Sequence, residues 1–94
     1  MSTMNMHDAL YHFCDQMELV LDEHYPKKGE TWQTNTIGQL EERLIEEFDE
    51  WKKSNSPLQS AEELIDVANF CMFLYHRYVD EWAEKVGKIF DKRV

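Results

Sequence analysis

The sequence has little of what disulfide-stapled or turn-rich folds require. Its 94 residues include only 3 glycines, 2 prolines and 2 cysteines. Cys14 and Cys71 both lie in apolar segments of helical pattern, so we expect them to be buried, reduced thiols in a cytoplasmic protein. No strand pattern, internal repeat or low-complexity tract is present.

Long apolar runs and positive charge are also scarce. No stretch approaches the roughly 18 consecutive apolar residues of a membrane-spanning helix, and residues 1–6 lack the basic segment and apolar core of a secretory signal. The chain has 19 acidic and 10 basic residues, a net charge of −9. Nucleic-acid binding normally needs a basic surface, so we expect neither a nucleic-acid nor a membrane partner.

Apolar and aromatic side chains, by contrast, are plentiful, at 43% and 13% of the chain. A domain this small buries a modest fraction of its surface, which leaves a thin margin of stability. This length predicts one domain over residues 1–94, and the helical patterns described below make it all-α; we expect residues 1–5 to be disordered. This small bundle of three to four helices would be completed by assembly into a homo-oligomer, a dimer or a tetramer.

Apolar spacing of three and four predicts the first two helices. One covers residues 6–25 and ends where Pro26 disfavours helix at the residue before it. Residues 27–35 read as a polar loop. A second helix follows Thr36, which can form a capping box with Gln39, and it ends near Lys53.

The third helix has two candidate starts, Pro57 at the first helical position or a capping box of Ser60 with Glu63. Residues 64–75 are apolar nearly all round, which predicts a central position in the bundle or its interface. The helical pattern resumes over residues 79–94, and the sequence leaves open whether the helix bends near Tyr78.

Two pairs of carboxylates recur at a spacing of three. Glu47 and Glu50 lie in the second helix, and Glu63 and Asp66 in the third. Residues three apart share one helical face, so the two pairs converge if these helices pack antiparallel. Four oxygen donors on facing helices would form a site for a hard metal ion.

Each pair can also be explained without a metal site. Residues 46–50 could form a solvated acidic face, as most acidic runs do, and Glu63 could serve only as a capping residue. Asp66 is harder to explain in this way, because the apolar residues around it predict burial at a cost of several kcal/mol. Asn69 lies one turn further on the same face, and Glu47 borders the apolar arc of its helix.

The donor set indicates which metal the site would hold. Carboxylates alone suit Mg²⁺, with Mn²⁺ as a substitute, whereas zinc prefers histidine or cysteine. A di-iron bundle uses Glu-x-x-His, and none of the 4 histidines has a glutamate three residues before it. Because Mg²⁺ inverts the local charge, even an acidic protein could then bind a nucleotide phosphate.

These motifs resemble those of the MazG-like, all-α nucleotide pyrophosphatase superfamily, EExxE followed by ExxD. Here they read Glu46-Glu47-x-x-Glu50, a spacer of twelve residues, and Glu63-x-x-Asp66. The resemblance covers roughly residues 25–80. It implies Mg²⁺-dependent hydrolysis of a nucleoside triphosphate to the monophosphate and pyrophosphate.

The resemblance also implies a role for each residue of the site. The metal would be held by Glu47, Glu50, Glu63 and Asp66, and Glu46 would orient or deprotonate the attacking water. The nucleotide would be contacted by four further residues: Asn69, Trp32 stacking on the base, Arg77 at the phosphates, and Lys28 as a competitor for that phosphate role.

Two of these residues could have a different role, and the whole chain could have a different function. Trp32 could be a packing anchor, and Arg77 could be a surface charge. The chain could be a non-catalytic acidic protein that binds a basic partner or mimics the charge of DNA. Burial of the carboxylates discriminates between the two classes of function, because a partner-binding surface has to be exposed.

Overall fold

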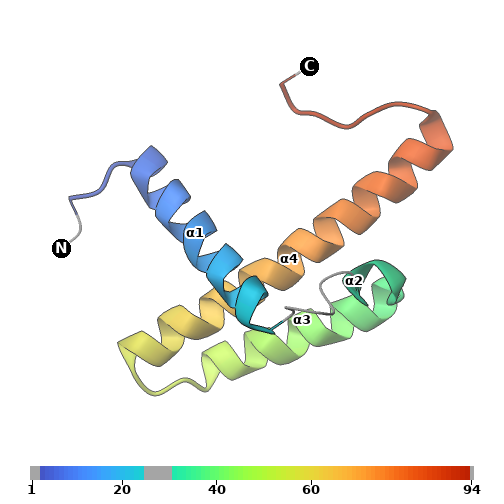
Figure 1. The fold of residues 1–94 in the computed structure, drawn as a ribbon. Helices are drawn as coiled ribbons and strands as arrows, with labels where there is room; N and C mark the ends of the chain where they lie inside the picture. The colour runs from blue at the N-terminus through green and yellow to red at the C-terminus, as the bar shows by residue number, and fades with distance from the viewer. Residues whose placement is uncertain (1–2, 25–30, 94) are drawn as a thin grey trace.

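The computed structural model describes residues 3–24 and 31–93, and the regular secondary structure in these ranges is all α-helix (Figure 1). Its helices are α1 (Met6–His24), α2 (Thr31–Thr34), α3 (Ile37–Lys52) and α4 (Pro57–Val86). The predicted all-α class is therefore confirmed. In the described ranges, no helix is both long enough and apolar enough to cross a membrane.

The long helix α4 organises the fold, because each of the other helices packs on it. α3 lies beside it in the antiparallel orientation, and α1 crosses its middle (Figure 1). Where the helices meet, the buried apolar core among the described residues consists of Leu40, Phe70, Phe73 and Leu74. This arrangement places the EExxE and ExxD motifs on adjacent helices.

Local hydrogen bonds fix where α3 and α4 begin. The predicted capping box of α3 is confirmed, since Thr36 Oγ1 accepts from the Gln39 N–H at 3.0 Å and Gln39 Oε1 accepts from the Thr36 N–H at 2.9 Å. For α4 the structure selects the earlier start, with Ser56 as N-cap and Pro57 as the first helical residue. Ser60 therefore lies inside the helix, and Glu63 is no capping residue.

The end of α4 differs from the prediction. The helix passes through Tyr78 without a break, but it stops at Val86 and does not continue to residue 94. Gly87 adopts the left-handed conformation at φ 68° and donates its N–H to the Ala83 carbonyl at 2.8 Å. A residue without Cβ adopts this geometry at little cost, so the glycine terminates a pattern that periodicity alone would extend.

Two further predictions are wrong in the described residues. Part of the predicted loop, Thr31–Thr34, forms a helical turn too short to produce a periodic pattern. Both Cys14 and Cys71 are exposed, because α1 has no buried residue in the single chain and its contact with α4 covers only one face. Lys28 lies outside the described residues.

Candidate metal centre

Three glutamates from two helices converge at the interface of α3 and α4. Glu47 and Glu50 lie one turn apart on α3, and Glu63 reaches them from α4. One carboxylate oxygen of each lies within 4.8 Å of the others. The antiparallel packing therefore brings together three of the four predicted metal ligands.

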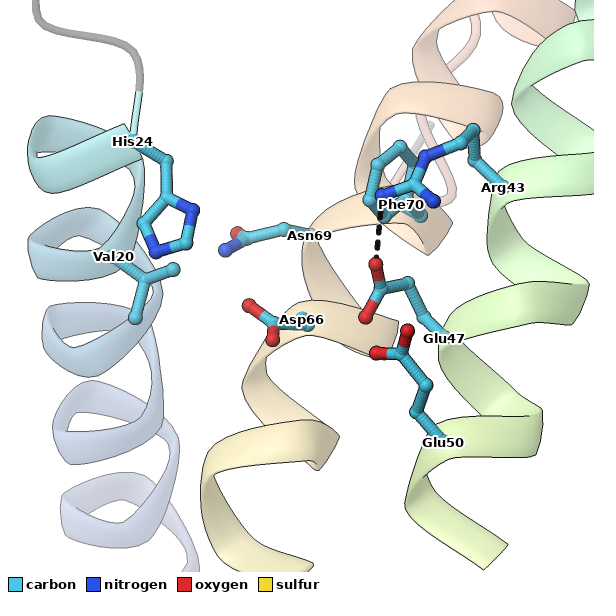
Figure 2. Close-up of a pocket in the computed structure, with 8 residues that line it drawn as sticks. All are labelled: Val20, His24, Arg43, Glu47, Glu50, Asp66, Asn69 and Phe70. Atoms are coloured by element: carbon cyan, nitrogen blue, oxygen red, sulfur yellow. Dashed lines mark hydrogen bonds and ion pairs between the residues drawn. The ribbon is translucent and has the colours of Figure 1, made fainter. Parts of the chain in front are cut away.

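A cavity of about 240 Å³ opens beside this cluster and contains the fourth predicted ligand, Asp66. Figure 2 shows Glu47 and Glu50 reaching from α3 toward α4, while Asp66 and Asn69 reach from α4 toward α1. The full lining draws on three helices: Val20, His24, Arg43, Glu47, Glu50, Asp66, Asn69 and Phe70.

Glu47 is the most deeply buried acid of the site, with 6% of its surface exposed. Burial first, and then repulsion from Glu50 and Asp66, raises its pKa to about 7, although Arg43 acts in the opposite direction. The Arg43 Nη2 donates to Glu47 Oε1 at 2.8 Å. One arginine thus compensates the negative charge of the cluster only in part, although Glu50 is exposed and Glu63 is half-buried.

The carboxylates on α4 are perturbed in the same direction. Burial, followed by repulsion from Glu50 and Asp66, raises the pKa of Glu63. Burial also raises the pKa of Asp66, while His24 counteracts this. The Oε2 atom of Glu63 is buried and has no hydrogen-bond partner among the described residues. The ionised form of each carboxylate would be stabilised by a nearby positive charge.

Asn69 contributes a second buried oxygen that lacks a partner. The residue is 3% exposed, and its Nδ2 donates a long hydrogen bond of 3.4 Å to the Met17 carbonyl. Its Oδ1 has no hydrogen-bond partner within the described ranges. An unpaired buried acceptor is costly, so this oxygen suits a ligand that supplies a donor or a cation.

The structure buries Glu47 more deeply than Asp66, whereas the sequence predicted burial most strongly for Asp66. Asp66 is only partly buried, and Glu47 is buried. The apolar residues around Asp66 do not all face the core, since Leu64 and Tyr75 on the same helix are 40% and 50% exposed. The inward direction of Glu47, which its place beside the apolar arc of α3 predicted, is confirmed.

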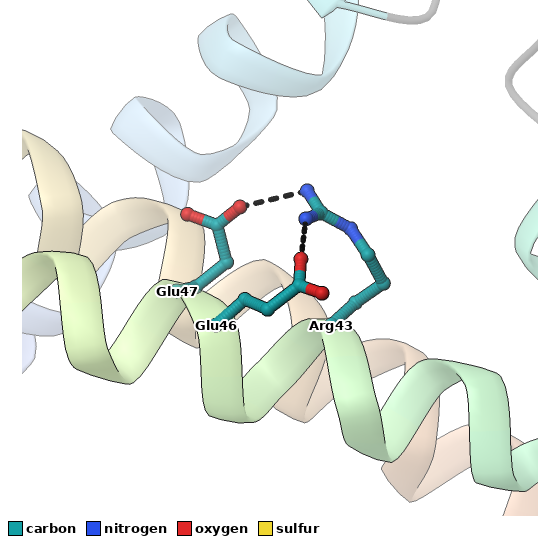
Figure 3. Close-up of polar contacts among 3 residues, drawn as sticks. All are labelled: Arg43, Glu46 and Glu47. Carbon is teal, nitrogen blue, oxygen red and sulfur yellow. Dashed lines mark hydrogen bonds and ion pairs between the residues drawn. The ribbon is translucent and has the colours of Figure 1, made fainter.

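Glu46, the predicted water-orienting residue, lies outside the group of three converging glutamates. Its side chain is 57% exposed and pairs with Arg43, whose guanidinium also bonds Glu47 (Figure 3). It does not line the cavity. The structure therefore gives this residue a contact with Arg43 and none with the site's interior.

Two of the predicted nucleotide contacts, Trp32 and Arg77, also lie outside the cavity lining. The ring of Trp32 stacks on Phe73 at a centroid distance of 5.3 Å and an interplanar angle of 8°. The Arg77 Nη1 donates to the backbone carbonyls of Trp32, at 3.0 Å, and of Asn35. These contacts attach α2 and the start of α3 to α4.

Among the cavity residues with ionisable side chains, Arg43 and His24 were not predicted from the sequence. Arg43 lies four residues before Glu47, a spacing at which opposite charges pair on a helix, so this signal was present in the sequence. His24 is the last residue of α1. It reaches the site only because α1 crosses α4, and local sequence carries no signal for such a crossing.

The donor set fits a hard divalent cation. Three carboxylates, a fourth nearby and an amide oxygen match the oxygen ligands that Mg²⁺ and Mn²⁺ prefer. The raised pKa values and the unpaired Glu63 oxygen indicate a site short of positive charge. The arrangement can therefore hold a cation and orient a water molecule next to it.

Comparison with models of known protein families, with curated proteins and with solved structures finds no significant match to this chain. The resemblance to the MazG-like superfamily stays a prediction from the two motifs. The chemistry of the site is argued below from its own residues.

Proposed function

We propose that this protein is a Mg²⁺-dependent nucleotide pyrophosphohydrolase that converts a nucleoside triphosphate and water to the monophosphate and pyrophosphate. The observation that carries the proposal is the convergence of Glu47, Glu50 and Glu63 within 4.8 Å beside a cavity lined by Asp66. An acidic site attracts a phosphate only through a cation, so the metal and the nucleotide are proposed together.

The three glutamates would hold Mg²⁺, which when bound polarises the phosphoanhydride and offsets charge on the leaving pyrophosphate. Asp66 faces the same cavity but is outside the 4.8 Å group. This position suits it to orient the attacking water and to accept its proton. Glu46 has no part in this scheme, because its carboxylate lies outside the cavity.

The volume of the cavity bears on how a nucleotide would bind. Pockets that enclose a whole small ligand usually measure about 300–1,000 Å³, and this cavity measures about 240 Å³. It suits the triphosphate, with the base and sugar extending beyond it. Asn69 Oδ1 could then accept a hydrogen bond from a sugar hydroxyl or from water at the cavity wall.

The burial of Glu47 argues against the rival function, a non-catalytic acidic protein that binds a basic partner. A partner surface needs accessible carboxylates, and a carboxylate that is 6% exposed offers almost none of its charge to a basic protein. Keeping an acid there destabilises the fold unless a ligand compensates for it. Such a cost is typical of a functional site.

We also propose that the chain self-associates in the cytoplasm. The helix α1 has no buried residue, and its Met6, Leu10 and Tyr11 are 85%, 56% and 66% exposed. A second copy could cover this face. The two free thiols, Cys14 and Cys71, suit a reducing compartment.

The decisive experiment measures pyrophosphate release from a panel of canonical and modified nucleoside triphosphates, with and without Mg²⁺. We expect turnover of at least one member only with the metal, and a Mg²⁺-dependent rise in the melting temperature. Inactivity on the whole panel, together with an unchanged melting temperature, would overturn the proposal.

A further inference from the structure

Arg43 lies where two ligands could disrupt its pairing with Glu47. A bound cation would compete with Arg43 for Glu47, and a bound phosphate would compete with Glu47 for Arg43. Its Nη2 donates to Glu47 Oε1 at 2.8 Å, and its second terminal nitrogen pairs with Glu46 (Figure 3). The guanidinium carbon also lies 5.2 Å from the centre of the Phe70 ring. These contacts hold a positive charge at the wall of the cavity (Figure 2).

The pairing occupies one oxygen of Glu47, a proposed metal ligand, and leaves the other oxygen facing Glu50 (Figure 2). Glu47 is one of the three glutamates that converge within 4.8 Å, and the oxygen bonded to Arg43 is unavailable to a cation on that side. A divalent cation held by these glutamates would weaken the attraction of Glu47 for the guanidinium, because it places a second positive charge beside the same carboxylate.

The released guanidinium could move without leaving the cavity. The side chain of Arg43 is 47% exposed, so the packed core does not enclose it, and the face of Phe70, 5.2 Å away, offers a surface along which it can shift. Arginine binds phosphate through two parallel N–H bonds. Binding of the metal by the carboxylates would therefore release, inside the cavity, a side chain that can donate hydrogen bonds to a phosphate.

We propose that Arg43 is a phosphate-binding residue whose availability is coupled to the metal: it pairs with Glu47 in the metal-free protein and moves to the nucleotide's phosphates when Mg²⁺ occupies the glutamates. This inference rests on the proposed function and adds a specific binding residue to it. Metal and Arg43 compete for Glu47, whereas nucleotide and metal bind with positive coupling.

The test compares two affinities in the full-length protein: Mg²⁺ alone, by calorimetry, and an α,β-methylene nucleoside triphosphate at saturating Mg²⁺. Arg43→Gln should bind Mg²⁺ alone several-fold more tightly and the analogue about tenfold or more weakly. Arg43→Lys, which keeps the charge without the planar fork, should fall between. Lys53→Gln is the matched control, since Lys53 pairs with Asp49 at 2.7 Å at the exposed C-terminal end of the same helix.

The outcomes separate this inference from the proposed function. If the wild type binds neither Mg²⁺ nor the analogue, the proposed function fails and this inference with it. If the wild type binds both but Arg43→Gln weakens both, or changes neither beyond the Lys53→Gln control, only the role of Arg43 is refuted.

A measurement on the wild type covers the case in which the Arg43 variants fail to fold. The chain has 3 arginines, so their side-chain nitrogen signals can be assigned individually. The Arg43 signals should shift when Mg²⁺ is added and again when the analogue follows. Signals that stay constant through both additions would refute the exchange of partners.

Discussion

Trp32 and Phe73 stack almost in parallel, with ring centroids 5.3 Å apart and an interplanar angle of 8°. Phe73 is 3% exposed and belongs to the buried core, and Trp32 is one of the partly buried residues that pack on this core. The pair attaches α2 to α4. It gives the tryptophan a structural role that can be tested against the predicted stacking on a nucleotide base.

Replacing Trp32 tests which role dominates. Trp32→Ala should lower the free energy of unfolding by about 2 kcal/mol, less than for a fully buried tryptophan because the residue is partly exposed. Trp32→Phe should recover most of this loss. Denaturant unfolding measures both. A variant that keeps its stability but binds the nucleotide analogue more weakly would contradict the packing role and support base stacking.

The acidic cluster should make the metal-free protein less stable as the pH rises. Glu47 has a pKa of about 7 in the fold against an ordinary value of 4.5, so between these values the native state binds more protons than the unfolded state. The contribution of this group to stability is then greatest at and below the lower value, falls as the pH rises between the two values, and levels off above about 7. The full effect is on the order of 3 kcal/mol for this residue alone.

Thermal unfolding between about pH 5 and pH 8 tests this dependence. The raised pKa values of Glu63 and Asp66 act in the same direction. Saturating Mg²⁺ should flatten or reverse the trend, because the metal favours the ionised carboxylates. A metal-free melting temperature that rises steadily over this range would contradict the electrostatic description of the site.

Local sequence signals predict where α3 begins and where it ends, but they do not predict where α4 ends. Thr36 with Gln39, and Ser56 with Pro57, are local signals, and α3 and α4 begin where they indicate. The end of α4 depends on one glycine, Gly87, inside a pattern that remains apolar and periodic beyond it.

The sequence predicts the features of the site that depend on spacing within one helix, but not those that depend on how the helices cross. Glu47 and Glu50 share a helical face by their spacing alone, and the structure joins them with Glu63. The extent of burial could not be predicted in this way. It depends on where α1 crosses α4, which determines that Asp66 is partly exposed and that His24 lines the cavity.

Removing the charge of Glu47 should separate stability from function. Glu47→Gln keeps the shape of the side chain but removes a buried acid whose ionised form is disfavoured. At about pH 8 the metal-free variant should be more stable than the wild type by about 1–3 kcal/mol and should lose its stabilisation by Mg²⁺. Differential scanning calorimetry with and without the metal measures both effects.

The matched control for this change is Glu42→Gln, because Glu42 is exposed on the same helix and lies outside the cavity. It removes the same charge from the same helix and should leave both the metal-free stability and the response to Mg²⁺ almost unchanged. Equal effects of the two substitutions would show that total charge matters and not the buried position.

Asp66→Asn tests the chemical step of the proposed reaction. The amide keeps the size of the side chain but cannot accept a proton from water, so turnover should fall about 10²–10⁴-fold, while the helix content and the melting temperature hold or rise. Asp80→Asn, at an exposed position of the same helix, is the control and should retain full turnover. Because Asp66 lies outside the group of three glutamates, the variant should still bind Mg²⁺. Loss of Mg²⁺ binding along with turnover would instead make Asp66 a fourth metal ligand, as the motif alone predicts, and would move the role of proton acceptor to another residue.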